Sequence, residues 1–141
     1  MSDRFRPLWD FDDLDASAQR FRAQLEQEDS DAGRAEVLAQ VARVHGLRGA
    51  FAECERVLDE AEPLAGDDAR ANVRLELERG RMFRSSGDPE AAYPLFASAY
   101  DRALELFELA LEARLRDPGN PQAIEWAHEA IAEAKQALAG A

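Results

Sequence analysis

The sequence has one cysteine and two histidines, and these shortages exclude several kinds of site. A lone cysteine, Cys54, cannot form an internal disulfide, which suits a reducing compartment and a small buried side chain. His45 lies on the apolar side of a predicted helix, and His128 has no second histidine at the spacing of a zinc motif. A nucleophile elbow and a phosphate-binding glycine loop are also absent from the sequence. We therefore expect no metal site, no cofactor and no enzymatic activity.

Long apolar runs and an excess of basic residues are missing too. No segment approaches the roughly 20 apolar residues that span a bilayer, and the N-terminus has no basic start followed by an apolar run. The net charge is −12 at pH 7 and the isoelectric point is near 4.6, so the average surface repels nucleic acids and anionic lipids. These observations predict a cytoplasmic protein whose partners are neither nucleic acids nor membranes.

Residues that favour β-strands are scarce. Valine, isoleucine and threonine are few, and no run alternates apolar and polar residues, whereas alanine, leucine, glutamate and arginine dominate. A chain of 141 residues is long enough for one domain and short for two. The composition therefore predicts a single all-α domain over residues 1–141.

Apolar residues recur at helical spacing in six segments. The predicted helices cover residues 14–28, 31–47, 50–62, 68–85, 89–116 and 121–138. Gly49 and Gly87 suit the turns between helices, because glycine readily takes the left-handed conformation that closes a helix. Asp88 is expected to cap the helix that follows Gly87, and Pro63 to break the chain after the third helix.

The N-terminal end shows no periodicity before the first helix. Residues 1–7 are expected to form a frayed tail. Trp9 and Phe11 come just outside the first helix, where they can fold back on its apolar face. The carboxylate of Asp13 or Asp15 can accept the free amide hydrogen bonds of the first turn.

One apolar pattern occurs twice, eleven residues apart, within the fifth predicted helix. Eleven residues make about three helical turns, overshooting by only about 20°, so both copies fall on the same face. The segment therefore predicts one continuous helix over residues 89–116, about 42 Å long at 1.5 Å per residue. The residues of this stripe are Ala92, Phe96, Ala99, Ala103, Phe107 and Ala110.

Two stretches of the chain resemble the tetratricopeptide repeat, whose pattern is W-x2-L-G-x2-Y, then A-x3-F, then P, over two antiparallel helices. The first stretch carries Leu38, Val41, Ala42, His45, Gly49, Cys54, Leu58 and Ala61, and the second carries Gly80, Phe83, Gly87, Ala92, Phe96 and Ala99. The resemblance implies that Ala42 and Gly80 lie where the helices of a repeat cross closely. It also implies that Phe96 fills the gap between repeats.

The resemblance implies a short α-solenoid of antiparallel helix hairpins. Residues 8–28 would form a capping helix, 31–65 the first repeat, 68–100 the second repeat, and 101–139 a partial repeat with the C-terminal helix. We call the pattern that occurs twice in residues 89–116 the eleven-residue echo. It looks like the second helices of two successive repeats joined end to end, without the first helix that would normally lie between them. The result is a long C-terminal helix hairpin.

In tetratricopeptide-like folds the first helix of each repeat lines a concave groove, so the resemblance implies a protein or peptide ligand in that groove. The residues expected there are Arg43, Leu47, Arg74, Leu77, Arg81 and Arg84. Arginine binds carboxylates with two hydrogen bonds, so these arginines suggest an acidic peptide or a C-terminal carboxylate as the ligand. The alternative is that the arginines pair with neighbouring carboxylates such as Glu36, Glu76 and Glu78.

Self-association is a second possibility, from a different functional class. A long apolar stripe needs to be covered, since each large side chain kept from water contributes about 1.5 to 3 kcal/mol. Its second half has only the C-terminal helix to pack against, and apolar area left uncovered there would favour a homodimer through the C-terminal helices. A third and weaker possibility is a remnant left by a deletion in a longer repeat protein.

Overall fold

The computed structural model describes residues 4–116 and 122–140, and these residues form six α-helices and one short 3₁₀-helix. The elements are η1 (Arg6–Leu8), α1 (Leu14–Gln27), α2 (Asp31–Leu47), α3 (Phe51–Ala65), α4 (Ala69–Ser85), α5 (Pro89–Arg116) and α6 (Gln122–Gly140). No strand occurs within the described ranges, which confirms the predicted all-α class. Within the same ranges, no helix has the length and apolar character needed to cross a membrane.

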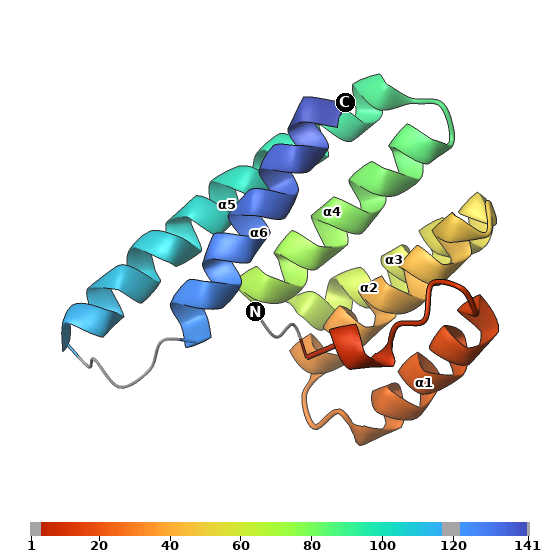
Figure 1. Ribbon diagram of the computed structural model, residues 1–141, viewed down its shortest axis with the longest axis horizontal. Helices are drawn as coiled ribbons and strands as arrows, with labels where there is room; N and C mark the ends of the chain where they lie inside the picture. Colours follow the sequence, from red (N-terminus) through yellow and green to blue (C-terminus); the bar gives the residue numbers. More distant parts are fainter. Residues whose placement is uncertain (1–3, 117–121, 141) are drawn as a thin grey trace.

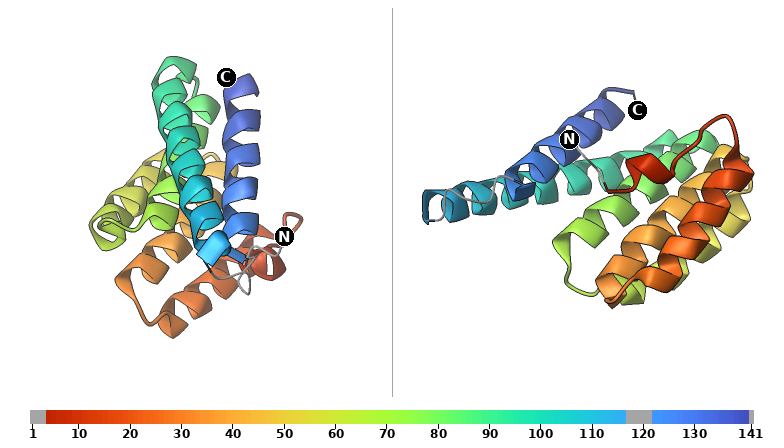
Figure 2. Two further views of the ribbon diagram at one scale, coloured as in Figure 1. Left: turned by 90° about the vertical axis from the view of Figure 1, so that its left-hand side faces the viewer. Right: turned by 60° about the horizontal axis from the view of Figure 1, so that its bottom comes forward.

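Helix α4 lies at the centre of the molecule (Figure 1). It packs against α2 and α3 on one side and against α5 on the other, and it touches α6 at a few points. The pairs α2–α3, α4–α5 and α5–α6 are hairpins of neighbouring helices, while α1 packs on the far side of α2. Helices α5 and α6 project together past the end of α4, as Figures 1 and 2 both show.

Side-chain oxygens cap the N-termini of four helices, and two of these caps, Asp13 and Asp88, were predicted. Asp13, Ser30, Asp68 and Asp88 each accept a hydrogen bond from the backbone N–H three residues further on, at 2.9 to 3.1 Å. The turn after α2 has Gly49 at φ 74°, and the turn after α4 has Gly87 at φ 95°. These positive φ angles confirm the predicted role of both glycines.

Pro63 does not break the chain where the sequence predicted it would. It lies inside α3, which continues to Ala65 and is closed by Gly66 at φ 52°. In the last turn of a helix, proline removes only the hydrogen bond that its missing N–H would donate to the carbonyl of Asp59. The helix tolerates that loss because its C-terminal turn is almost complete.

The prediction of a frayed tail over residues 1–7 was wrong for the residues that the structure describes. Phe5 is only 1% exposed and its ring packs edge-on against Phe21, with 6.2 Å between the centroids. Arg6–Leu8 forms η1, and Trp9 packs edge-on against Phe21 at 4.9 Å. We call residues 4–13 the N-terminal arm. The arm is part of the hydrophobic core.

The predicted long helix is confirmed as one element, α5, with Pro94 inside it. The stripe of the eleven-residue echo faces α4 and α6, and five of its six members are buried: Ala92, Phe96, Ala99, Ala103 and Ala110. Phe107 is only half-buried and lies beside the ring of His128, with the centroids 5.9 Å apart. The second half of α5 is therefore covered less completely than the first.

The second hairpin depends on one close approach. A Cβ atom built on Gly80 would lie 2.5 Å from Cε1 of Phe96, so only glycine lets the fully buried Phe96 ring lie against the backbone of α4. Ala42, at the corresponding place on α2, is also completely buried. Both small residues are therefore buried, and the close approach of a neighbouring helix is shown for Gly80.

Gly80→Ala is expected to lower the free energy of unfolding by about 1 to 3 kcal/mol, because the added methyl group overpacks the site against Phe96. The matched control is Gly46→Ala on α2, where the new Cβ would lie at an ordinary 3.7 Å from Sγ of Cys54. That change should be neutral or stabilising by up to about 1 kcal/mol, since alanine favours the helix. Urea unfolding followed by circular dichroism measures both. Equal effects of the two substitutions would contradict the account of the α4–α5 contact.

Candidate binding groove

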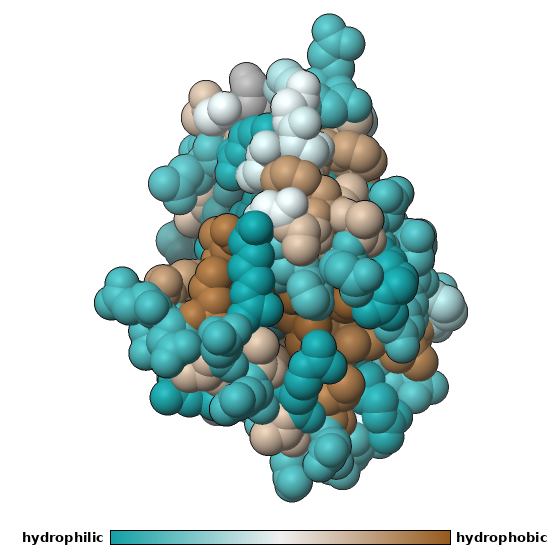
Figure 3. Space-filling view, turned by 90° about the vertical axis from the view of Figure 1, so that its right-hand side faces the viewer, coloured by the Kyte–Doolittle hydropathy of each residue, from teal (hydrophilic) through white to brown (hydrophobic). Residues whose placement is uncertain are grey.

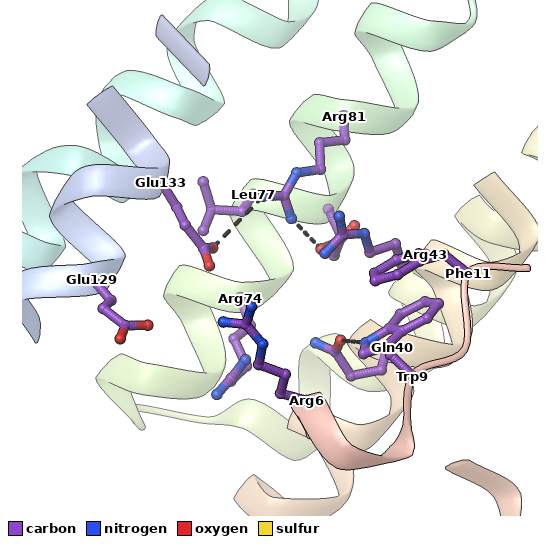
Figure 4. Close-up of a pocket in the computed structure, with 11 residues that line it drawn as sticks. Arg6, Trp9, Phe11, Gln40, Arg43, Arg74, Leu77, Arg81, Glu129 and Glu133 are labelled. Atoms are coloured by element: carbon purple, nitrogen blue, oxygen red, sulfur yellow. Dashed lines mark hydrogen bonds and ion pairs between the residues drawn. The ribbon is translucent and has the colours of Figure 1, made fainter. Parts of the chain in front are cut away.

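A cavity of about 200 Å³ opens between the N-terminal arm, α2, α4 and α6 (Figure 4). The arm contributes Arg6, Trp9 and Phe11, α2 contributes Gln40 and Arg43, α4 contributes Arg74, Leu77, Glu78 and Arg81, and α6 contributes Glu129 and Glu133. A second cavity, of about 160 Å³, shares Arg43, Glu78 and Arg81 with the first. We call the two adjoining cavities the groove.

The second cavity extends the groove toward the ends of α2 and α4. It adds Leu47, Met82 and Arg84 to the lining. Figure 3 shows the side of the molecule on which these helices end, where apolar residues gather in the middle of a largely hydrophilic surface. Together the two cavities are lined by all six residues that the sequence placed in a groove, Arg43, Leu47, Arg74, Leu77, Arg81 and Arg84.

Two of these arginines are already engaged by carboxylates within the protein. Nε of Arg74 lies 2.7 Å from Oε2 of Glu36, and both side chains are largely buried. Arg81 donates a hydrogen bond to Glu78, which is only 4% exposed, and lies 3.6 Å from Glu133 of α6. The charge of Glu78 beside it raises the pKa of Arg81.

Arg74 also links the arm to α6. Its guanidinium carbon lies 4.8 Å from the ring centroid of Phe5 and 5.7 Å from that of Trp126. These distances are typical of cation–π contacts. Arg74 therefore holds three parts of the chain together and lies in the floor of the groove mainly as a structural residue.

Arg43 and Arg84 differ from that pair. Neither forms an ion pair with any residue in the part of the chain that the structure describes. Arg43 lies over the rings of Trp9 and Phe11, at 5.4 and 5.6 Å from their centroids, and Arg84 lies 5.3 Å from that of Phe96. Both guanidinium groups lie against aromatic rings, and their N–H groups donate to no carboxylate within the described residues.

Sequence reasoning did not place seven residues of the first cavity in the groove: Arg6, Trp9, Phe11, Gln40, Glu78, Glu129 and Glu133. Arg6 was assigned to a frayed tail, and Trp9 and Phe11 to packing on the first helix. A segment without periodicity does not indicate which way its side chains point. Glu129 and Glu133 are four residues apart on α6, so they share a helix face. That spacing was visible in the sequence, but the packing of α6 beside α4 was not.

Among the described residues, no three His, Cys, Asp or Glu side chains come together to hold a metal ion. Burial raises the pKa of the Cys54 thiol to about 11, and the nearby charge of Glu78 adds to this shift. Burial lowers the pKa of His45. Cys54 is therefore a protonated, buried thiol at neutral pH, which is a poor nucleophile.

Comparison of the chain with protein-family models, with curated proteins and with solved structures gave no match in any of the three. The resemblance to the tetratricopeptide repeat therefore rests on the residues of this chain alone.

Arg81→Gln is expected to lower the free energy of unfolding by about 3 to 5 kcal/mol, because it leaves the buried charge of Glu78 without its partner. Arg43→Gln is the matched control from the same groove. Arg43 lacks an ion pair with a described residue, so its loss should cost no more than about 1 kcal/mol of cation–π interaction. Urea unfolding measures both variants. If Arg81→Gln were as mild as the control, the assignment of Arg81 as a structural residue would be wrong.

Proposed function

We propose that this protein is a tetratricopeptide-like interaction module that binds a peptide segment of a partner protein in the groove on α2, α4 and α6. The main support for the proposal is that the carboxylates of the groove have partners within the protein, while three of its arginines form no ion pair with a described residue. Glu78 and Glu133 are paired with Arg81, and Glu129 is not free either. Arg6, Arg43 and Arg84 have no ion pair with a described residue. The groove therefore offers cations to a ligand, although the chain as a whole carries a charge of −12.

The arrangement of the helices supports the tetratricopeptide-like part of the proposal. Two successive hairpins, α2–α3 and α4–α5, pack side by side through α2 and α4. The groove residues of α2 and α4 lie on the first helices of these two hairpins, while the N-terminal arm and α6 supply the other lining residues. A segment bound there would contact the same helices that line the concave surface in that family.

The dimensions of the groove favour a short extended segment. Arg74 and Arg84 bound its floor on α4, and ten residues of helix rise about 15 Å. An extended chain rises about 3.3 Å per residue, so about five ligand residues fit along this length. Leu47 and Met82 supply apolar contacts beside the free guanidinium groups. We therefore propose a cytoplasmic partner with a segment in which acidic and apolar residues alternate.

Self-association through the C-terminal helices is the second candidate. Leu109 and Leu111 are exposed on the second half of α5, which favours some contact there. Residues two apart on a helix point about 200° from each other, so these leucines lie on different faces. A single dimer interface would need one continuous face, and the groove is therefore the better supported site.

The proposal predicts selective binding of acidic peptides. The probes are two pools of end-capped pentapeptides, in which apolar residues alternate either with Asp and Glu or with Lys and Arg. The acidic pool should bind, and Arg43→Glu combined with Arg84→Glu should weaken binding by about 100-fold, since each lost contact to a charged group is worth about 1.4 kcal/mol or more. Isothermal titration calorimetry measures the affinity.

The control for this double variant is Arg20→Glu with Arg22→Glu. Both arginines are exposed on α1, outside the groove, and the pair changes the net charge of the protein by the same amount. This control should bind within about threefold of the parent. Equal binding of the acidic and basic pools, or equal losses in both double variants, would contradict the proposed function.

A further inference from the structure

We infer that the N-terminal arm is part of the binding site: Trp9 and Phe11 position the guanidinium of Arg43, and Arg6 adds a second cation, so that a ligand carboxylate binds between Arg6 and Arg43 beside the two aromatic rings. This inference rests on the proposed function and adds to it. The helical hairpins alone do not supply these residues, because all three arm residues precede α1.

The arm is fixed well enough to act as a wall of the cavity. The hydroxyl of Ser17 donates a hydrogen bond to the carbonyl of Asp10 at 2.9 Å and accepts one from its N–H at 2.7 Å. Arg4 pairs with Glu28 at 2.8 Å, and the hydrogen bond from Arg4 lowers the pKa of that carboxyl. With Phe5 buried as well, the arm is attached on both sides of the residues that face the cavity.

Trp9 and Phe11 form a stacked pair at the cavity. Their ring centroids are 4.7 Å apart and the ring planes differ by only 6°. Nε1 of Trp9 donates a hydrogen bond of 2.9 Å to Oε1 of Gln40 on α2, which sets the orientation of the indole (Figure 4). Arg43 lies on the next turn of α2, and its guanidinium lies against the two rings.

Phe11 has no role in the core that would explain its position. Its side chain is 59% exposed, so its main contacts are with Trp9 and Arg43 at the cavity. A guanidinium held over an aromatic face keeps its N–H donors in the plane, directed outward, where they can meet a carboxylate. Phe11 is thus a positioning residue for Arg43.

Arg6 completes the anion site. It lines the same cavity as Arg43, and it makes no ion pair with a residue in the described ranges. Of the carboxylates that line the cavity, Glu78 and Glu133 are paired with Arg81, and Glu129 also has an interaction partner. Arg6 and Arg43 are therefore the two groups of this cavity that lack a counter-charge within the described protein, and a side-chain carboxylate of Asp or Glu suits them.

The test uses the fluorescence of Trp9 in the full chain. The sequence has two tryptophans, so Trp126→Phe leaves Trp9 as the single reporter while keeping an aromatic ring near Arg70 and Arg74. Addition of the acidic peptide pool should change the Trp9 emission saturably, and the basic pool should not. In this background, Phe11→Ala and Arg6→Gln should each weaken binding by about five- to tenfold.

The controls are matched in exposure and residue type. Tyr93→Ala removes an aromatic ring that is 57% exposed on α5, far along the sequence from the arm, and Arg20→Gln removes an exposed arginine on α1. Both should bind like the parent. Circular dichroism should show the same helix content in these variants as in the Trp126→Phe background, because the side chains of Arg6, Phe11, Arg20 and Tyr93 are exposed.

The outcomes separate this inference from the proposed function. Weaker binding in Phe11→Ala and Arg6→Gln, with normal controls, supports the arm as part of the site. Parent-like binding in both variants, together with loss in Arg43→Glu, overturns the role of the arm and leaves the groove as the binding site. Absence of any Trp9 response and of any calorimetric binding by the parent overturns the proposed function, and the inference with it.

Discussion

The contact between Gly80 and Phe96 is the constraint on which the second half of the molecule depends. Because a glycine faces the ring, α4 and α5 approach closely enough to bury a whole phenylalanine between them. This approach sets the direction of α5, and the alanines further along α5 let α6 pack tightly on it. Helix α6 in turn brings Glu133 to Arg81 on α4. The position of the Glu133 carboxylate in the groove therefore depends on the absence of a Cβ atom at Gly80, on the side of α4 that faces α5.

Arginines have two different roles along the groove. Arg74 and Arg81 are mostly buried and paired, and each joins elements that are distant in sequence: Arg74 joins the arm, α2 and α6, and Arg81 joins α4 and α6. Removing one partner from such a buried pair leaves an uncompensated charge, which ties these residues to stability. Arg43 and Arg84 contact aromatic rings and form no ion pair with a described residue. A strip of arginines that looks uniform in the sequence therefore divides into residues that are paired with carboxylates and residues that contact aromatic rings.

Periodicity and turn chemistry made much of the fold predictable. The eleven-residue echo predicted the whole of α5, and Gly49 and Gly87 predicted two turns, since each of these signals is local. The N-terminal arm was not predictable in this way, because Phe5 has no periodic neighbours and is buried by residues on other elements. The pair between Arg74 and Glu36 spans 38 residues and exists only once α2 and α4 are packed. The groove residues came from the resemblance, whereas Arg6, Trp9 and Phe11 required the folded arm.

Nuclear magnetic resonance of the ¹⁵N-labelled chain, titrated with the acidic peptide pool, tests the central claim most directly because it reports on every face of the protein at once. The account predicts the largest changes at the indole N–H of Trp9 and at the amides of Arg43, Met82 and Arg84, which surround the groove. Changes centred on the exposed leucines of α5, Leu109 and Leu111, with none at Trp9, would contradict it.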